Sequence, residues 1–347
     1  MVTHTPVDIR TLSLPDIEKF FVENNEKLFR AHQVYEWLWK KGCRSFDEMT
    51  NLSKSTRQFM EAKFIFPVLI LEKENTSIDR TIKSIYRLHD DLLIEGVLIP
   101  EANRTTACIS SQAGCPLACT FCATGFLGFK RNLAFTEIID QVMDINRQSI
   151  KNFHIPLSNI VYMGMGEPLL NYEAVLKSIE KITSPDGMGM SPQRITVSSV
   201  GIPSMIRRLA DDKVRFHFAL SLHAADNEKR SRIIPLNKKY PIEELTEALI
   251  YFHTTTKKRV TIEYLLFNGF NDTLMDAADL ARFCKNFPVK INLIEYNPVE
   301  GSVYKKSEQP RMNVFKEFLE RKNLVVNVRK SRGGDIHAAC GQLATDH

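Results

Sequence analysis

The chain has 347 residues, of which 44% are hydrophobic and 25% charged, as in an ordinary soluble globular protein. This length allows one large α/β domain and a small accessory domain. The formal net charge of +5 fits a nucleic-acid partner but does not require one. The N-terminus lacks the pattern of a signal peptide, and no apolar run approaches the ~20 residues that span a bilayer. We therefore expect a cytoplasmic protein with no membrane contact.

Helical periodicity dominates the first part of the chain. Apolar residues recur at helical spacing in three segments, and Pro15 stands near the start of the first one. The pattern predicts a compact helical accessory domain over residues 1–75. Two strand-like runs follow, at 84–88 and 92–99, so residues 76–104 are predicted to form a linker with a small β extension.

From residue 105 onward, strand-like and helical patterns alternate, which predicts an α/β fold built from βαβ units. The expected strands are 106–110, 159–163, 195–199, 216–222, 260–266 and 291–296, with a last strand at 324–328. Six repeats are fewer than the eight of a closed barrel. We therefore predict a partial (β/α)6 TIM-like barrel over residues 105–347, open enough to admit a large substrate.

Three cysteines follow the first of these strands with the spacing C-x3-C-x2-C: Cys115, Cys119 and Cys122. Thiolates bind iron–sulfur clusters. Three of them leave one iron of a [4Fe–4S] cluster open for the amino and carboxylate groups of S-adenosylmethionine. A structural zinc site is the alternative, but such sites usually pair two ligands with a second Cys or His pair, and none with that spacing lies nearby. The spacing resembles that of the radical SAM superfamily.

Further polar residues stand at the ends of successive predicted strands. The turn at 163–168 contains Gly166, which lets the backbone approach a ligand, and Glu167, which could accept a hydrogen bond from a methionine ammonium group. A Gly-x-Gly turn alone is more often only a tight turn. The later strand ends carry Ser198, Ser221, Leu222, His223 and Asn297. Each alone is typical of a turn or cap, but together they indicate a cofactor pocket.

Two of the remaining cysteines, Cys108 and Cys340, require a separate interpretation. Cys108 lies on the first strand of the barrel, and Cys340 lies in the C-terminal segment among small neighbours. Lone cysteines are usually small buried hydrophobic residues. Gly333 and Gly334 could make the segment before Cys340 mobile, so local chemistry leaves a reactive and a structural role equally open for Cys340.

Taken together, these motifs resemble the RlmN family over about residues 84–347, and residues 1–75 match that family's RNA-binding accessory domain only in general character. The resemblance rests on Cys108, the triplet, 163–168, Ser198, 221–223, 291–298 and the terminal Ala-Ala-Cys-Gly-Gln-Leu. It implies a radical SAM enzyme that methylates C2 of adenosine 2503 in 23S rRNA, and also tRNA. It further implies a monomer that takes electrons from a donor such as flavodoxin.

The resemblance also implies the role of each site residue. One S-adenosylmethionine methylates Cys340, and a second is cleaved at the cluster, so that two are used per turnover. The radical formed from the methyl group of Cys340 adds to C2, and Cys108 resolves the adduct through a transient disulfide. Glu95 matches the family's proton acceptor. It shares a strand face with apolar residues, where burial would raise the carboxylate pKa toward that of a general base.

Two alternatives to this function stay open at this point. A Cfr-type enzyme methylates C8 of the same adenosine and has both outlying cysteines, although the pair Glu167-Pro168 resembles the C2 enzymes. A non-catalytic, metal-containing RNA-binding protein is the second alternative. The basic runs at 130–131, 229–232, 238–239 and 329–332 are candidates for phosphate contacts, although most such runs are solvated surface. Gly334 and His337 depart from the acidic residues expected there.

Overall fold

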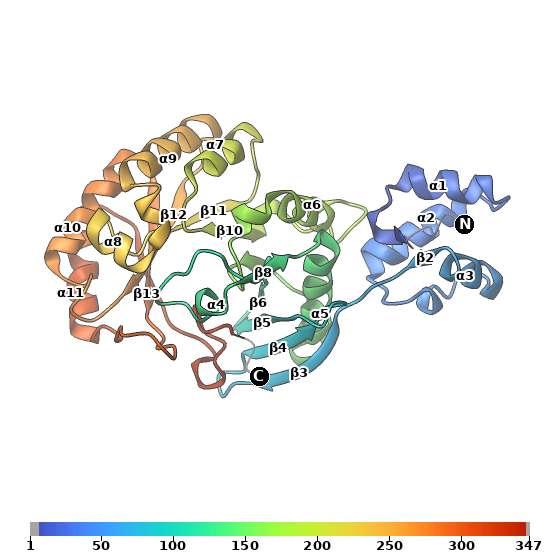
Figure 1. Cartoon of the computed structure of the whole chain (residues 1–347), viewed down its shortest axis with the longest axis horizontal. Helices are drawn as coiled ribbons and strands as arrows, with labels where there is room; N and C mark the ends of the chain where they lie inside the picture. Colours follow the sequence, from blue (N-terminus) through green and yellow to red (C-terminus); the bar gives the residue numbers. More distant parts are fainter. Residues whose placement is uncertain (1–6, 345–347) are drawn as a thin grey trace.

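The computed structural model describes residues 7–344, in which a small N-terminal unit stands beside a larger α/β body (Figure 1). The small unit is helical, as predicted. Ser13 caps its first helix together with Asp16, and Pro15 stands in the first turn. The elements of this unit are β1 (Val7–Asp8), η1 (Ile9–Thr11), α1 (Leu14–Glu23), α2 (Phe29–Glu36), η2 (Trp37–Lys41), η3 (Phe46–Glu48), α3 (Lys54–Glu61) and β2 (Phe64–Ile65).

The small unit has its own apolar core, which extends onto the first helix of the larger body. Ile17, Phe21 and Trp39 are buried in it. The Trp39 ring stacks on Phe135 of α5 (Phe135–Phe153), with ring centroids 6.2 Å apart. The unit is therefore packed against the barrel, not merely tethered to it.

A ten-stranded sheet organises the larger body, in the order β14-β13-β12-β11-β10-β9-β6-β5-β4-β3. Pairing is parallel from β6 to β14 and antiparallel from β3 to β6. The strands are β3 (Ile70–Thr76), β4 (Ile82–Arg87), β5 (Leu93–Glu101), β6 (Arg104–Cys108), β9 (Asn159–Tyr162), β10 (Ile195–Ser199), β11 (His217–Ser221), β12 (Val260–Leu266), β13 (Val289–Glu295) and β14 (Val326–Arg329). The six predicted barrel strands and the last strand are all present, so the partial barrel is confirmed.

Helices cover the outer face of the parallel strands (Figure 1). Apolar side chains of the strands such as Val197, Leu220 and Ile262 are fully buried in this layer. The helices are α5, α6 (Tyr172–Thr183), α7 (Pro203–Asp211), α9 (Ile242–Thr256), α10 (Leu274–Phe283) and α11 (Gln309–Glu320). Shorter elements are β7 (Gln112–Gly114), α4 (Ala123–Phe126), β8 (Phe129–Asn132), η4 (Pro168–Asn171), η5 (Pro192–Arg194), α8 (Asn227–Ile233), η6 (Pro235–Lys238), η7 (Cys284–Asn286) and η8 (Gly334–Ile336).

Strand β3 differs from the sequence-based expectation, because it occupies the end of the segment predicted to be helical. Six of its seven residues are exposed. Its sequence, Ile-Leu-Glu-Lys-Glu-Asn-Thr, also lacks the alternation of apolar and polar residues that predicts a half-buried strand. It is recognised as a strand only through its antiparallel pairing with β4. The β extension thus has three strands before β6, not two.

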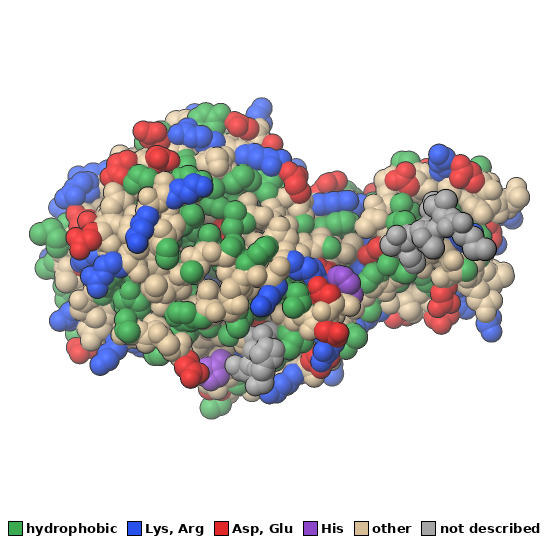
Figure 2. Space-filling view, in the orientation of Figure 1, with side chains coloured by type: hydrophobic (Ala, Val, Ile, Leu, Met, Phe, Trp, Pro, Cys, Tyr) green, Lys and Arg blue, Asp and Glu red, His purple; other side chains and the backbone are tan. Residues whose placement is uncertain are grey.

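The surface of the larger body has no single sign of charge on the face seen in Figure 2. Hydrophobic side chains gather over its centre, where α4 and β8 lie in Figure 1, and both signs of charge are mixed around them. Within residues 7–344, no helix is long and apolar enough to cross a membrane.

Candidate functional site

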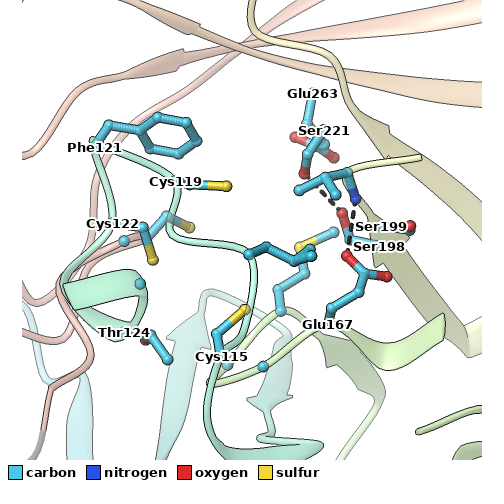
Figure 3. A pocket seen from close by; sticks show the side chains of 18 of the residues that line it. Cys115, Cys119, Phe121, Cys122, Thr124, Glu167, Ser198, Ser199, Ser221 and Glu263 are labelled. Atoms are coloured by element: carbon cyan, nitrogen blue, oxygen red, sulfur yellow. Dashed lines mark hydrogen bonds between the residues drawn. The ribbon is translucent and has the colours of Figure 1, made fainter. Parts of the chain in front are cut away.

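The three clustered cysteines line a cavity at the C-terminal ends of the parallel strands. Figure 3 shows their side chains on one side of this cavity, with Glu167, Ser198 and Ser221 on the other. We call it the first cavity. Its walls include Cys115, Cys119, Cys122, Gly166, Glu167, Ser198, Ser221, His223 and Cys340. Most of the residues predicted to bind the cofactor therefore lie together, although they are spread over more than a hundred positions in the chain.

The loop that carries the cysteines is held by a close backbone contact. Gly114 has φ +73°, and a Cβ there would stand 1.8 Å from the carbonyl oxygen of Gly128, so no other residue fits without displacing the backbone. The N–H of Cys115 donates to the same carbonyl over 3.1 Å. The first cysteine is thus fixed at the point where the loop leaves β7.

The electrostatics of the cysteines suit a metal cluster. Burial raises the pKa of Cys115 to about 12 and that of Cys119 well above its usual range. Without a nearby cation they are therefore neutral thiols, and a bound iron cluster would stabilise the thiolates. In the part of the chain that the structure describes, no three His, Cys, Asp or Glu side chains are grouped to hold one metal ion. A four-iron cluster needs more widely spaced ligands than one ion does, so three thiols lining one cavity fit the cluster.

Glu167 presents a carboxylate on the wall opposite the cysteines. It accepts hydrogen bonds from the N–H groups of Leu169, at 3.1 Å, and Val200, at 3.0 Å. Burial nevertheless raises its pKa to about 6. Gly166, with φ +94°, precedes it, and a Cβ there would lie 2.4 Å from the side chain of Gln112. The glycine lets Gln112 cross beneath the turn and accept the N–H of Glu167 at 2.8 Å.

Serine and histidine side chains complete the first cavity. The hydroxyls of Ser198 and Ser221 lie 3.1 Å apart. His223 accepts the N–H of Leu265 on Nδ1 at 3.1 Å, and burial lowers the pKa of the imidazole to about 3. The ring is therefore neutral, with its proton on Nε2 available as a donor. Leu222 has no exposed side chain and does not line the cavity.

A second, larger cavity of about 980 Å³ lies inside the partial barrel. Cys108 and Cys340 both line this second cavity. Of the two, only Cys340 also lines the first cavity. Asn297, which the sequence pattern groups with the cofactor residues, lines this second cavity and not the first. Cys340 is exposed and lines both cavities, so it stands where they meet.

Arg329 and Glu263 stand beside the two outlying cysteines and line both cavities. Burial raises the pKa of Cys108 to about 12, with Cys340 as a second cause, and the positive charge of Arg329 opposes this rise. The Arg329 Nη1 atom lies 3.4 Å from Oε2 of Glu263, and the other carboxylate oxygen, Oε1, accepts from the side-chain amide of Asn292 at 2.8 Å. Arg329 is therefore oriented by a buried carboxylate.

The C-terminal segment that carries Cys340 is anchored at two places. Near its start, Asp335 accepts the hydroxyl of Ser77 at 2.6 Å and the N–H of Ile78 at 3.1 Å. Near its end, the carbonyl of Gly341 accepts the N–H of Ala123 at 2.7 Å, directly after the cysteine loop. The paired glycines at 333 and 334 thus belong to a segment tied down on both sides.

Glu95 is fully buried and lines neither cavity. Its carboxylate lies 3.4 Å from the ammonium of Lys83, which also donates to the carbonyl of His337 at 3.4 Å. Val97 pairs with Cys108 across β5 and β6. Because side chains two apart share a face, Glu95 lies on the face of Cys108, as its diagonal neighbour under the C-terminal segment.

The basic runs predicted to bind phosphate differ in whether their side chains are buried, are paired with a carboxylate or face a cavity. Arg230 is buried, donates to the carbonyl of Leu222 at 3.2 Å, and braces strand ends, so its assignment to phosphate was wrong. Lys229 pairs with Asp276 at 2.6 Å, and Arg131 with Glu137 at 2.8 Å. The run at 329–332 reaches the second cavity. Composition reveals a cluster of charges but not which members are buried or paired.

Comparisons with known proteins identify the family. Residues 7–65 match the ribosomal RNA large subunit methyltransferase N-terminal domain, and residues 109–281 match the radical SAM superfamily. A protein of Christiangramia forsetii named probable dual-specificity RNA methyltransferase RlmN is 52% identical over 97% of this chain and 96% of its own length. Its namesake in Flavobacterium psychrophilum is 50% identical over 97% of each chain.

A solved structure shows the same architecture over nearly the whole chain. The crystal structure of a radical SAM methyltransferase from Sphaerobacter thermophilus matches with a TM-score of 0.93 and 37% sequence identity, covering 98% of this chain and 100% of that one. Identity of 50% and 52% with relatives over nearly their full length, together with this agreement in fold, leaves one assignment. The chain belongs to the RlmN family of the radical SAM superfamily.

Proposed function

We propose that this protein is a radical SAM RNA methyltransferase that methylates C2 of an adenosine in 23S rRNA and tRNA, with Cys340 as the carrier of the methyl group. Membership of the superfamily implies a [4Fe–4S] cluster and S-adenosylmethionine. The observation that carries the proposal is the position of Cys340, which lines both cavities. A group on its sulfur can be reached from the cofactor on one side and from a substrate on the other.

The first cavity supplies the cofactor's ligands. Cys115, Cys119 and Cys122 would hold the cluster, leaving one iron for S-adenosylmethionine. When bound, this pair supplies an electron and a hydrogen-abstracting radical. Glu167 would accept the ammonium of the methionine moiety, and the neutral His223 and the serine pair offer donors to its other polar groups. We propose that Gly166, which lines the first cavity, lets the backbone lie close to the bound cofactor.

The second cavity supplies the groups that finish the transfer. An adenine placed there adjoins Cys340, which carries the methyl, and Cys108, which would resolve the adduct as a thiolate. Arg329 favours that thiolate. Glu95, on the same face as Cys108, would accept the C2 proton once the C-terminal segment that covers it shifts. Leu222 would support the first cavity by packing in the core behind it. Asn297 would contact the substrate from the wall of the second cavity.

We assign the remaining properties from the family's chemistry. The protein uses two molecules of S-adenosylmethionine per turnover, one for the Cys340 methyl and one for the radical. It works in the cytoplasm as a monomer, with a donor such as flavodoxin. The accessory unit, residues 1–75, binds RNA, and residues 76–104 join it to the catalytic core.

Mass spectrometry of RNA nucleosides after an anaerobic reaction tests the proposal. The cluster-reconstituted protein is incubated with ribosomal RNA or tRNA, S-adenosylmethionine and a reductant. The expected product is 2-methyladenosine. Formation of 8-methyladenosine would transfer the assignment to the Cfr-type reaction, and a colourless, iron-free protein that binds zinc would exclude both reactions.

A further inference from the structure

The inside of the partial barrel is polar, unlike the interior of an ordinary barrel. Closed (β/α)8 barrels are filled by layers of branched aliphatic side chains. Here the inward positions of the parallel strands hold polar groups at their N-terminal ends. The second cavity is lined there by Arg104, Asn159, Thr196, His217, Arg259 and Lys290. The outward positions between them, such as Val197, Phe218 and Ile262, are buried and apolar.

The period of two along the strands explains this difference. Arg259, directly before β12, and Thr261 and Glu263 on that strand all line the second cavity, because alternate side chains share one face. Lys290 and Asn292 line it from β13 for the same reason. The four steps from residue 259 to residue 263 span about 13 Å at 3.3 Å per residue. One polar wall therefore leads from Cys108 and Cys340 to the N-terminal ends of the strands.

Positive charge dominates this wall. Six Lys or Arg side chains line the second cavity, against Glu101 and Glu263. Both carboxylates are already paired, with Arg104 at 2.6 Å and Arg329 at 3.4 Å. Within residues 7–344, Arg259 and Lys290 form no ion pair that would neutralise them. Burial lowers the pKa of His217, and the charges of Lys258 and Lys290 lower it further, consistent with a positive potential at this end.

The size and polarity of the cavity indicate its occupant. Its volume, about 980 Å³, is at the upper end of the range of about 300–1,000 Å³ usual for small-molecule pockets. One adenine beside the cysteines does not need cations at the far end of the barrel. A nucleotide strand does, because each nucleotide adds a phosphate charge.

We propose that this cationic barrel interior binds the backbone of a single RNA strand next to the methylated adenosine, with Arg259 and Lys290 contacting its phosphates. The proposal rests on the function proposed above and deepens it. Sequence-specific recognition of RNA usually uses unstacked, single-stranded segments, which a partial barrel can admit. A double helix cannot follow the strand into this space.

A pair of matched double variants tests the inference. Arg259→Gln with Lys290→Gln removes the two inward charges. Lys257→Gln with Lys285→Gln removes two exposed charges nearby in the chain that line neither cavity. The probe is a short, fluorescein-labelled, unstructured RNA with one central adenosine, and its affinity for the cluster-reconstituted protein is measured by anisotropy over a series of salt concentrations. A duplex of the same sequence is the second probe.

The inward double variant should bind the single strand about tenfold more weakly and with a salt slope smaller by about 1.4, since each phosphate contact on a single strand contributes about 0.7. The control double variant should keep the slope of the unaltered chain. Equal losses in both double variants, or an equal loss for the duplex, would overturn the inference. Melting curves of all three proteins show whether each is folded.

Failure of the inference and failure of the function are distinguishable. If the unaltered chain methylates RNA while the inward double variant binds like its control, the function stands and the barrel interior is not the strand's site. If binding follows the expected pattern but no methylated nucleoside forms, the strand's site stands and the function falls.

Discussion

The two cavities of this protein differ in how their chemistry is encoded. The first is built from a contiguous loop with three cysteines and from residues that directly end strands. The second is built from alternate residues along strands far apart in the chain. A short motif therefore marks the place where a radical would be made, whereas the place where it would be used becomes visible only when the strands are assembled. Cys340 belongs to both places, and variants on either side of it separate them.

The largest expected effect separates making the radical from using it. Cys115→Ala should abolish both cleavage of S-adenosylmethionine and methylation, because the cluster loses one of its three thiolates. Cys340→Ala should keep slow cleavage while methylated RNA falls below detection. Anaerobic assays that quantify 5′-deoxyadenosine and methylated nucleosides measure both outcomes. Methylation at a normal rate by Cys340→Ala would remove this cysteine from the mechanism.

Replacing Cys108 should stop the reaction later, within the second cavity. Cys108→Ala should accumulate protein covalently joined to RNA, because no thiol is left to resolve the adduct. Cys284→Ala is the matched control, since Cys284 is also a buried free cysteine but lines neither cavity. Denaturing electrophoresis and intact-protein mass spectrometry detect the adduct. Free product formed at the normal rate would contradict the resolving role.

Arg329 should set the pH at which the adduct is resolved. Its charge lowers the pKa of Cys108, so Arg329→Gln raises that pKa further and leaves less thiolate at a given pH. Product release should slow by about tenfold for each unit of added pKa, and its pH profile should move to higher pH. Arg329→Lys keeps the charge and should restore most of the rate. An unshifted profile in Arg329→Gln would show that the guanidinium acts only by packing.

Glu167 offers a smaller, pH-dependent test of the first cavity. Its pKa of about 6 means that the carboxylate becomes protonated as the pH falls through that value. Binding of S-adenosylmethionine should therefore weaken by about fourfold between pH 7.5 and 5.5, because a neutral acid pairs poorly with an ammonium group. Equilibrium dialysis with reconstituted protein measures this change. Glu167→Gln should bind weakly at both pH values, and a profile identical to that of the unaltered chain would exclude Glu167 as the acceptor.

Features that are local in the sequence could be predicted, whereas features that depend on how the strands pair in the fold could not. The barrel strands were predicted because their apolar runs alternate with helices, and the residues directly at strand ends meet because parallel strands end at one edge. Leu222 fails as a lining residue because the side chain next to Ser221 points into the core. Arg230 was misassigned because its run looks like solvated charge, although the guanidinium is buried.

The inward cations were missed for a related reason. Arg259 ends a short basic run that follows a predicted helix, and such runs are usually solvated surface. Lys290 is a single charge directly before a predicted strand, which is unremarkable. They belong to one wall only through the parallel register that pairs Thr261 with Lys290 across β12 and β13. The roles of the cysteines as methyl carrier and resolving thiol remain predictions, as does that of Glu95.

The smallest expected effect concerns the anchoring of the segment between the two cavities. Asp335 fastens that segment to the turn between β3 and β4 through Ser77 and Ile78. Asp335→Ala should loosen the position of Cys340 without removing any reacting group. Small displacements of reacting atoms lower rates, so methylated RNA formed per 5′-deoxyadenosine should fall by about threefold. Asp186→Ala removes an exposed carboxylate in the loop after α6 and should leave this ratio unchanged. An unchanged ratio in Asp335→Ala would mean that the contact of Gly341 with Ala123 is sufficient to hold Cys340 between the two cavities.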